Sequence, residues 1–353
     1  MRSSVFFING GAGRVINSIP ALELFHTENP DDDFVIICEG GMDMFKNHPL
    51  LHSRAFDPNH KGIFDEKIKD RNCVSTEPYR VWEYYNQKCS LAQAFDIQIN
   101  NKGVRDLPKP TLKLNTEEDI KGFLAVKEVK EKTKKEKVII FQPFGRSSIN
   151  ANGFVYDSGG RSFDTMDSFE IVKRLQEKGY AIMLMSEFSV PYSDLGAKEP
   201  VSHPQNIGLR EWAGIIKNAD HFIGCDSVGQ HLANSLDKPA TVVLGSTFAI
   251  NTSHTSSSNI EIIDIDTDNK RYSPIRITFD DEIERSNDSC MKIGDNKSIF
   301  DKIINSVTKR TPVSKQPASN IKSLPNNLVF NPDSKSTPNL PFTTTGKKKN
   351  GKK

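Results

Sequence analysis

The sequence predicts an α/β fold built on parallel sheets, because strand-like and helix-like segments alternate along the chain in two separate series. The first series occupies residues 5–41 and the second occupies residues 138–265. A chain of 353 residues is too long for one small core and suggests about two domains of ~150 residues each.

The first series consists of a buried strand, a glycine-rich turn, a helix and a second strand. Its helix is predicted because apolar residues recur at Val15, Ile19, Leu22 and Phe25, a spacing that places them on one helical face. The four elements are predicted at residues 5–8, 9–13, 15–25 and 34–38. This order predicts parallel pairing of the two strands. Residues 42–106 show no pattern that assigns elements.

The second series follows a charged helix predicted at residues 117–137, which we interpret as a solvated helix and linker. Its short apolar runs alternate with amphipathic segments, as expected of repeated strand–helix–strand units. The predicted strands lie at residues 138–141, 181–185, 221–225, 241–244 and 260–265, and the predicted helices at residues 169–178, 209–218, 229–236 and 298–307.

The last part of the chain differs in composition. From residue 311 on, Pro, Ser, Asn and Thr dominate and few apolar residues remain, so burial cannot offset the entropy of ordering. The lysine cluster at 347–353 is either a solubilising end or a site for a polyanion that releases counterions. We therefore predict an N-terminal domain at 1–133, a second domain at 134–290, a closing helix at 291–310 and a disordered basic tail at 311–353.

Composition excludes several classes of protein. Lys and Arg total 47 against 45 for Asp and Glu, so the net charge of +2 does not indicate a nucleic-acid or membrane partner. No apolar run is long enough for a transmembrane helix, and no signal peptide is visible. The five cysteines are scattered without metal-ligand spacing, as expected of reduced thiols rather than disulfides or structural zinc. We expect a cytoplasmic protein.

The glycine-rich turn at residues 9–14 is the first candidate binding motif. Gly11 and Gly13 allow backbone N–H groups to approach a ligand, and the following helix would present its amino end to an anion. The third glycine of a dinucleotide fingerprint is replaced by Ile16, and no Gly-Lys-Ser/Thr follows, so a P-loop is excluded. A simple tight turn is the alternative.

The stretch around Asp226 is the second motif. A buried strand delivers Asp226 and Ser227 to its carboxyl end, where open α/β sheets bind ligands. Gly229 opens a helix whose free N–H groups suit a pyrophosphate, and His231 lies one turn further on. The structural alternative is that Asp226 or Ser227 only caps the helix.

Arginines beside glycines form the third motif. Gly145 and Arg146 follow the strand predicted at 138–141, and Arg161 follows Gly160. Guanidinium groups at a strand end are suited to bidentate contact with phosphate. Exposed loop arginines without a ligand are the alternative.

Together these segments resemble the GT-B glycosyltransferases of glycosyltransferase family 9, the heptosyltransferase-like group. The resemblance covers roughly residues 5–308. Residues 11–22 resemble that family's first strand–loop–helix, and residues 226–247 resemble its donor-site signature. Arg161-Ser162-Phe163 stands where the family has a basic residue followed by an aromatic one, and Cys290-Met291 resembles its C-terminal segment.

The resemblance implies two Rossmann-like domains facing a central cleft and an inverting sugar transfer without a metal or cofactor. The nucleotide-diphosphate sugar would be a co-substrate bound by the C-terminal domain, and the acceptor would lie on the N-terminal side. The donor-binding residues implied or indicated are Gly145, Arg146, Arg161, Asp226, Ser227, Gly229, Gln230 and His231. The acceptor-side loop would contain Gly11, Gly13 and Asn17.

Two positions depart from the family pattern. The family typically has Asp directly after its glycine loop as candidate base, but this chain has Arg14, which stays protonated. Loss of a base costs on the order of 10²–10⁴-fold in rate. Either Glu39 or Asp43 substitutes, or Arg14 contacts an anionic acceptor or the diphosphate. Val228 replaces the usual glycine, which leaves open both a different local turn and a donor other than ADP-heptose.

The acceptor and the class of activity stay open at this point. A lipopolysaccharide-type glycan is the acceptor that the family suggests, and Arg14 together with the lysine cluster keeps a hydroxymethylated base in phage DNA open as a second acceptor. A non-catalytic nucleotide-sugar or nucleic-acid-binding protein with a degenerate fold is the alternative class. The incomplete glycine fingerprint disfavours a dinucleotide-dependent oxidoreductase.

Overall fold

A computed structural model describes residues 3–157, 159–265 and 290–313, and its strands within these ranges form two parallel sheets and one antiparallel hairpin. The predicted α/β class is therefore confirmed. Residues 311–313 belong to the described part, and Thr311 is buried with its carbonyl accepting a hydrogen bond of 2.7 Å from the Tyr180 hydroxyl. The rest of the predicted disordered tail, including the lysine cluster at 347–353, lies outside the described residues.

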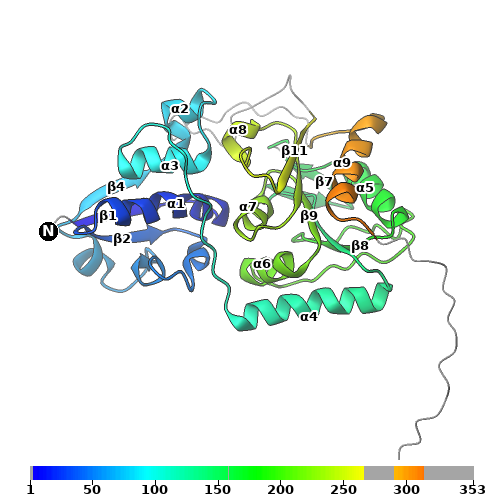
Figure 1. Cartoon of the computed structure of the whole chain (residues 1–353), viewed down its shortest axis with the longest axis horizontal. Coiled ribbons are helices and arrows are strands. Elements are labelled where there is room, and N and C mark those ends of the chain that lie inside the picture. Colours follow the sequence, from blue (N-terminus) through cyan, green and yellow to red (C-terminus); the bar gives the residue numbers. More distant parts are fainter. Residues whose placement is uncertain (1–2, 158, 266–289, 314–353) are drawn as a thin grey trace, which may run out of the picture. The chain divides into compact units, whose positions relative to one another are not determined.

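The first sheet has the strand order β3-β2-β1-β4, and neighbouring strands run parallel (Figure 1). Its strands are β1 (Ser3–Ile8), β2 (Asp33–Cys38), β3 (Ala55–Phe56) and β4 (Asn72–Thr76). The predicted pairing of the first two strands is confirmed, with Ser3 opposite Asp33 and Ile8 opposite Cys38. Helix α1 (Ala12–Glu28) packs on them through Phe25, whose ring centroid lies 4.8 Å from that of Phe6.

The segment between residues 42 and 106, which the sequence pattern did not assign, contains short elements. β4 has the sequence NCVST, and only Thr76 in it is buried, so it lacks the apolar run or alternation that predicts a strand. The helices of this segment are η1 (Met42–Phe45), η2 (His52–Arg54), η3 (Ile63–Ile68), η4 (Pro78–Arg80), α2 (Trp82–Tyr85) and α3 (Leu91–Asn100).

The second sheet has the strand order β11-β10-β9-β5-β8, again with parallel neighbours. Its strands are β5 (Val138–Gln142), β8 (Ala181–Leu184), β9 (His221–Gly224), β10 (Ala240–Leu244) and β11 (Ile260–Asp264). The associated helices are α5 (Thr165–Glu177), α6 (Leu209–Asn218), α7 (Val228–Ser235), α8 (Ala249–Thr252) and α9 (Lys297–Arg310). Each predicted strand and helix of the second series is present, with ends shifted by a few residues.

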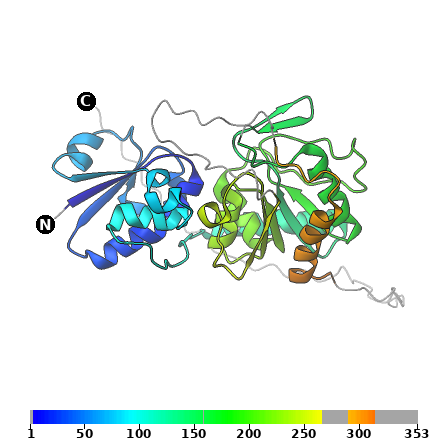
Figure 2. The same cartoon turned by 90° about the horizontal axis from the view of Figure 1, so that it is seen from above.

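A hairpin that the sequence pattern did not predict follows β5. Strands β6 (Ser148–Ala151) and β7 (Phe154–Asp157) pair antiparallel around Asn152 and Gly153, whose positive φ angles of 54° and 88° suit a tight two-residue turn. The hairpin projects from this part of the chain (Figure 2), with Ile149, Phe154 and Tyr156 exposed on its outer side. Its inner side carries the fully buried Asp157.

Helices α4 (Thr116–Thr133) and α6 lie side by side (Figure 1) and meet at two glycines. A Cβ atom at Gly122 would overlap the carbonyl group of Gly214, so the two backbones touch directly. Next to this contact, Glu118 pairs with Arg210 at 2.6 Å, and Arg210 also donates to the carbonyl of Asp43 at 3.1 Å. The contact thus joins α4, α6 and η1.

No helix in the described part of the chain is long and apolar enough to cross a bilayer.

We predict that Gly122→Ala destabilises the protein, because the added methyl group forces α4 and α6 apart. Overpacking of this kind typically costs about 1–3 kcal/mol. The measurement is the midpoint of urea unfolding, with Gly103→Ala as the matched control, because a Cβ atom there meets nothing within 4 Å. Equal midpoints for the two variants would contradict the close helix contact.

Candidate functional site

A pocket of about 1050 Å³ lies at the carboxyl ends of β5, β8 and β9. Parallel pairing places these strand ends at one edge of the sheet, which is where open α/β sheets bind ligands. The amino ends of α6 and α7 and the turn before α1 complete its wall. The lining segments include residues 10–14, 144–146, 185–189, 204–209 and 226–228.

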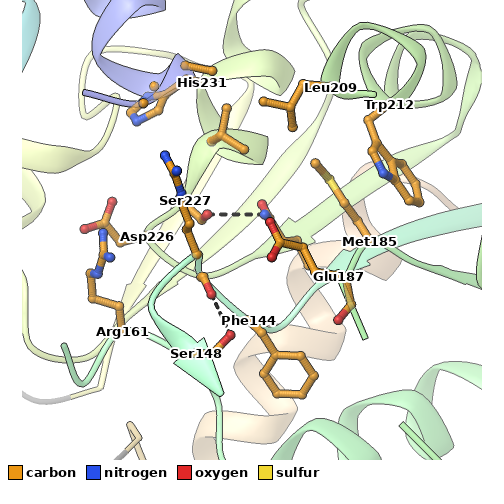
Figure 3. Close-up of a pocket in the computed structure, with 18 of the residues that line it drawn as sticks. Phe144, Ser148, Arg161, Met185, Glu187, Leu209, Trp212, Asp226, Ser227 and His231 are labelled. Atoms are coloured by element: carbon orange, nitrogen blue, oxygen red, sulfur yellow. Dashed lines mark hydrogen bonds between the residues drawn. The ribbon is translucent and has the colours of Figure 1, made fainter. Parts of the chain in front are cut away.

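One side of the pocket is polar. Figure 3 shows Arg161, Asp226, Ser227 and His231 along this side. Asp226 is 6% exposed and accepts a hydrogen bond of 2.9 Å from Gln230. Burial raises the pKa of Asp226 while the Arg161 guanidinium opposes that shift. Burial alone would lower the pKa of Arg161, but the carboxylates of Asp226 and Asp157 outweigh it and raise that pKa.

The Asp157 carboxylate holds the two arginine-bearing loops together. It accepts hydrogen bonds from the Ser147 hydroxyl at 2.7 Å, the Gly159 N–H at 2.9 Å, and the Ser162 N–H and hydroxyl at 2.9 and 2.6 Å. Burial raises its pKa, but these hydrogen bonds and Arg161 prevail and lower it. Because Ser147 follows Arg146 and Ser162 follows Arg161, one buried anion positions both loops.

The opposite side of the pocket is apolar. Met185 follows β8, and Leu209 and Trp212 come from the first turn of α6 (Figure 3). Phe144 and Phe188 stack with ring centroids 5.2 Å apart and an interplanar angle of 27°. These apolar side chains face the polar side across the pocket, and the exposed Glu187 lies between Ser227 and Met185 (Figure 3).

The glycine turn brings Gly11, Gly13 and Arg14 to the pocket, as expected of a binding loop. Arg14 does not project freely: it donates to the Thr76 carbonyl at 3.3 Å and lies 3.7 Å from the Glu77 carboxylate. Its guanidinium also stacks over the Tyr79 ring, 4.9 Å from the centroid. Its Nε is buried and makes no hydrogen bond in the described structure.

The predicted site residues fall into three groups. Those that line the pocket are Gly11, Gly13, Arg14, Gly145, Arg146, Arg161, Asp226, Ser227 and His231. Three others do not line the pocket but contact residues that do: Asn17 contacts His231, Gln230 contacts Asp226, and the Gly229 N–H donates to Gln142 Oε1 at 3.0 Å. Glu39 and Asp43 are exposed and are not among the lining residues.

Several lining residues escaped the sequence analysis. Met185 is the last residue of the strand predicted at 181–185 and Glu187 follows it, so the rule that ligands bind at strand ends would have found both. Trp212 and Leu209 open a predicted helix at the same edge. Tyr79 and Tyr84 come from the unassigned segment and carry no local signal. Among residues 3–157, 159–265 and 290–313, no three His, Cys, Asp or Glu side chains are grouped to hold a metal ion.

No protein-family model and no curated protein matches the sequence. Among solved structures, the chain is similar to a glycosyl transferase family 9 protein from Veillonella parvula, with a TM-score of 0.53 and 11% identity over 75% of this chain and 86% of that one. It is also similar to ADP-heptose lps heptosyltransferase II from E. coli, with a TM-score of 0.50 and 11% identity over 78% and 95% of the two chains. The similarity is one of fold.

The histidines beside the pocket predict a loss of stability below neutral pH. Burial lowers the pKa of His254 to about 4 and that of His231 well below its ordinary value of 6.5. Below about pH 6.5 the unfolded chain therefore binds more protons than the native state, and the contribution of His254 to the free energy of unfolding decreases by about 2 kcal/mol between pH 7 and pH 5.

We expect His254→Gln to reduce this decrease, measured by urea unfolding at both pH values. The control is His52→Gln, which removes a histidine that is exposed rather than buried. A pH dependence in His254→Gln identical to that of the parent protein would show that His254 is not buried as a neutral ring.

Proposed function

We propose that the protein is a GT-B glycosyltransferase of the family 9 type, which moves a sugar from a nucleotide-diphosphate sugar to a hydroxyl acceptor. The observation that carries this proposal is the pairing, in one pocket, of a polar side that bears Arg161 and Arg146, at the carboxyl edge of a parallel sheet, with an apolar side. A nucleotide-diphosphate sugar has the matching halves, namely an anionic diphosphate and a flat base.

The polar side supports binding of the diphosphate. Arg161 supplies a fixed positive charge, and α7 points its amino end at the pocket with Ser227 as N-cap and no acidic residue in the first turn. Helix amino ends attract phosphate through free N–H groups and the helix dipole. Arg146 is exposed at the rim, where a second guanidinium would neutralise the departing charge.

The apolar side supports binding of the base. Met185, Leu209 and Trp212 lie opposite Arg161 and Asp226 (Figure 3), so a base there would leave the diphosphate near the arginines. Ligand pockets commonly combine such apolar walls with a few polar groups that set orientation.

In the proposed reaction the acceptor hydroxyl attacks the anomeric carbon from the face opposite the diphosphate. The new carbon–oxygen bond forms as the bond to the diphosphate oxygen breaks, the configuration inverts, and the nucleoside diphosphate leaves with the bonding electrons. Arg161 and the amino end of α7 stabilise the developing negative charge, a contribution that is greatest in a site with fixed charges. The proposal assigns this task to protein groups rather than to a metal or cofactor.

A base must remove the proton of the acceptor hydroxyl. The two carboxylates predicted for this role are not the carboxylates that line the pocket. Glu39 and Asp43 are exposed outside the lining, whereas Asp226 and Glu187 are the carboxylates among the described lining residues. Arg14 occupies the position after the glycine loop and is engaged by Glu77. Glu39 and Asp43 remain our hypotheses for the catalytic base. We propose that Arg14 contacts an anionic acceptor or the diphosphate.

The same proposal includes two Rossmann-like domains, at 1–133 and 134–290, that face a cleft, and a cytoplasmic location. The E. coli structural neighbour is an ADP-heptose lps heptosyltransferase, which makes ADP-heptose one donor to test. For the acceptor, a lipopolysaccharide-type glycan and a hydroxymethylated DNA base are both retained. The second candidate function is a non-catalytic nucleotide-sugar or nucleic-acid-binding protein, which is favoured by Arg14 in place of a carboxylate.

One experiment separates these functions. The full-length protein is incubated with ADP-heptose, ADP-glucose, UDP-glucose or GDP-mannose and either lipopolysaccharide core or hydroxymethylated DNA, with and without EDTA, and products are identified by mass spectrometry. A mass increase of one sugar on either acceptor supports the enzyme. Calorimetric binding of a donor with neither transfer nor hydrolysis supports the binding protein, and loss of transfer in EDTA overturns metal independence.

We predict that Arg161→Gln weakens binding of the matching nucleoside diphosphate by about 10–100-fold, because a hydrogen bond to a charged group contributes about 1.5–3 kcal/mol. Isothermal calorimetry provides the measurement. Arg174→Gln is the matched control, since Arg174 pairs with Glu170 and Asp301 on α5 and α9, away from the pocket. Unchanged affinity in Arg161→Gln would overturn the placement of the diphosphate.

A further inference from the structure

The orientation of the Asn17 amide is determined by its surroundings. Asn17 lies on α1, and its Nδ2 is 2.7 Å from the carbonyl oxygen of Gly13 one turn earlier. A backbone carbonyl can only accept hydrogen bonds, so the atom facing it must be the amide NH₂ group. The same nitrogen lies 3.2 Å from Nδ1 of His231 on α7. The two hydrogens of this amide therefore point to Gly13 and to His231.

A donor aimed at Nδ1 determines the tautomer of His231. A neutral imidazole carries one proton, and a nitrogen that accepts a hydrogen bond from Asn17 cannot be the protonated one. Nε2 of His254 lies 2.9 Å from the same Nδ1, so this assignment requires His254 to carry its own proton on Nε2 and to share the Nδ1 lone pair with Asn17. Burial, assisted by His254, holds the pKa of His231 well below its usual range, so the ring is neutral at pH 7.

The other nitrogen of His231 is free to meet a ligand. Within the described residues Nε2 makes no hydrogen bond, and His231 lines the pocket beside Gly13, Ser227 and Asp226. A Cβ atom at Gly13 would lie 3.4 Å from Nε2 and 3.0 Å from Cδ2, so this edge of the ring faces the first turn of α1. Glycine at this position leaves room for a ligand atom at Nε2.

We propose that Asn17 is a positioning residue that holds His231 as the Nε2–H tautomer, so that His231 donates a hydrogen bond to an anionic oxygen of the bound ligand. The identity of that oxygen, a phosphate oxygen of the sugar donor, rests on the proposed function. The tautomer itself rests on the contacts of Asn17 alone. With its proton on Nε2, His231 cannot take a proton from the acceptor through that nitrogen.

The tautomer is measured directly by nuclear magnetic resonance of the full-length, ligand-free protein labelled with ¹⁵N-histidine. We expect Nδ1 of His231 to resonate as an unprotonated nitrogen and Nε2 as a protonated one at pH 7, with His231→Gln identifying the signals. Protonated Nδ1 in the parent protein would overturn the proposal whatever the function is.

The role of Asn17 is tested by Asn17→Asp, which replaces a donor with an acceptor next to Nδ1. We expect the proton of His231 to move to Nδ1 in this variant. Asn29→Asp is the matched control, because the Asn29 amide makes the same bond to a carbonyl four residues earlier, that of Phe25, but Asn29 is the C-cap at the far end of α1. An unchanged His231 spectrum in Asn17→Asp would remove Asn17 from the mechanism.

The donor role is tested with inorganic pyrophosphate as the probe, measured by calorimetry. His231→Ala should weaken binding by about 10–100-fold through the lost charged hydrogen bond, and His231→Gln should recover most of it, because the Gln amide places an N–H near Nε2. Equal losses in both variants would overturn the donor role.

These experiments distinguish failure of the proposed function from failure of the His231 assignment. If the tautomer and the pyrophosphate results hold but no sugar is transferred, the proposed function fails and the assignment of His231 stands. If sugar is transferred but Nδ1 carries the proton, the assignment fails and the proposed function stands.

Discussion

Parallel pairing of β5 with both β8 and β9 is the constraint on which the candidate site depends. Parallel strands end at the same edge of a sheet, so Gln142, Met185 and Asp226 reach one pocket although they are far apart in sequence. Helix α6, which follows β8, and helix α7, which follows β9, begin at that edge as well. Backbone pairing therefore brings the arginines, the apolar wall and the helix amino ends to one pocket.

A buried carboxylate then refines what the sheet places together. Asp157 is fully buried on the inner side of the β6–β7 hairpin and accepts hydrogen bonds from the loops that carry Arg146 and Arg161. A buried carboxylate without hydrogen-bond partners would destabilise the fold, so its hydrogen bonds fix the positions of both loops. The hairpin thereby links the strand end of β5 to the arginine beside Asp226.

The N-terminal turn completes the pocket through backbone proximity. Gly13 leaves space beside His231, and Asn17 joins α1 to α7 by a buried hydrogen bond. Arg14, in contrast, donates to the Thr76 carbonyl, pairs with Glu77 and stacks over the Tyr79 ring. The turn therefore contributes shape and a positioned amide, while the charge of Arg14 is partly neutralised by Glu77. The other cations of the pocket are Arg161, which faces the Asp226 and Asp157 carboxylates, and Arg146, which is exposed at the rim.

The sequence alone determined the α/β class, the elements of the second series, and the strand-to-helix position of Asp226, because these depend on local periodicity and turn chemistry. Only the tertiary structure revealed β4, whose partner β1 lies some 70 residues away and whose own residues show no apolar pattern. It also decided that Met185 and Trp212 face Arg161, that Glu39 and Asp43 do not line the pocket, and that Asn17 meets His231. Such contacts join residues distant in sequence, so no local signal records them.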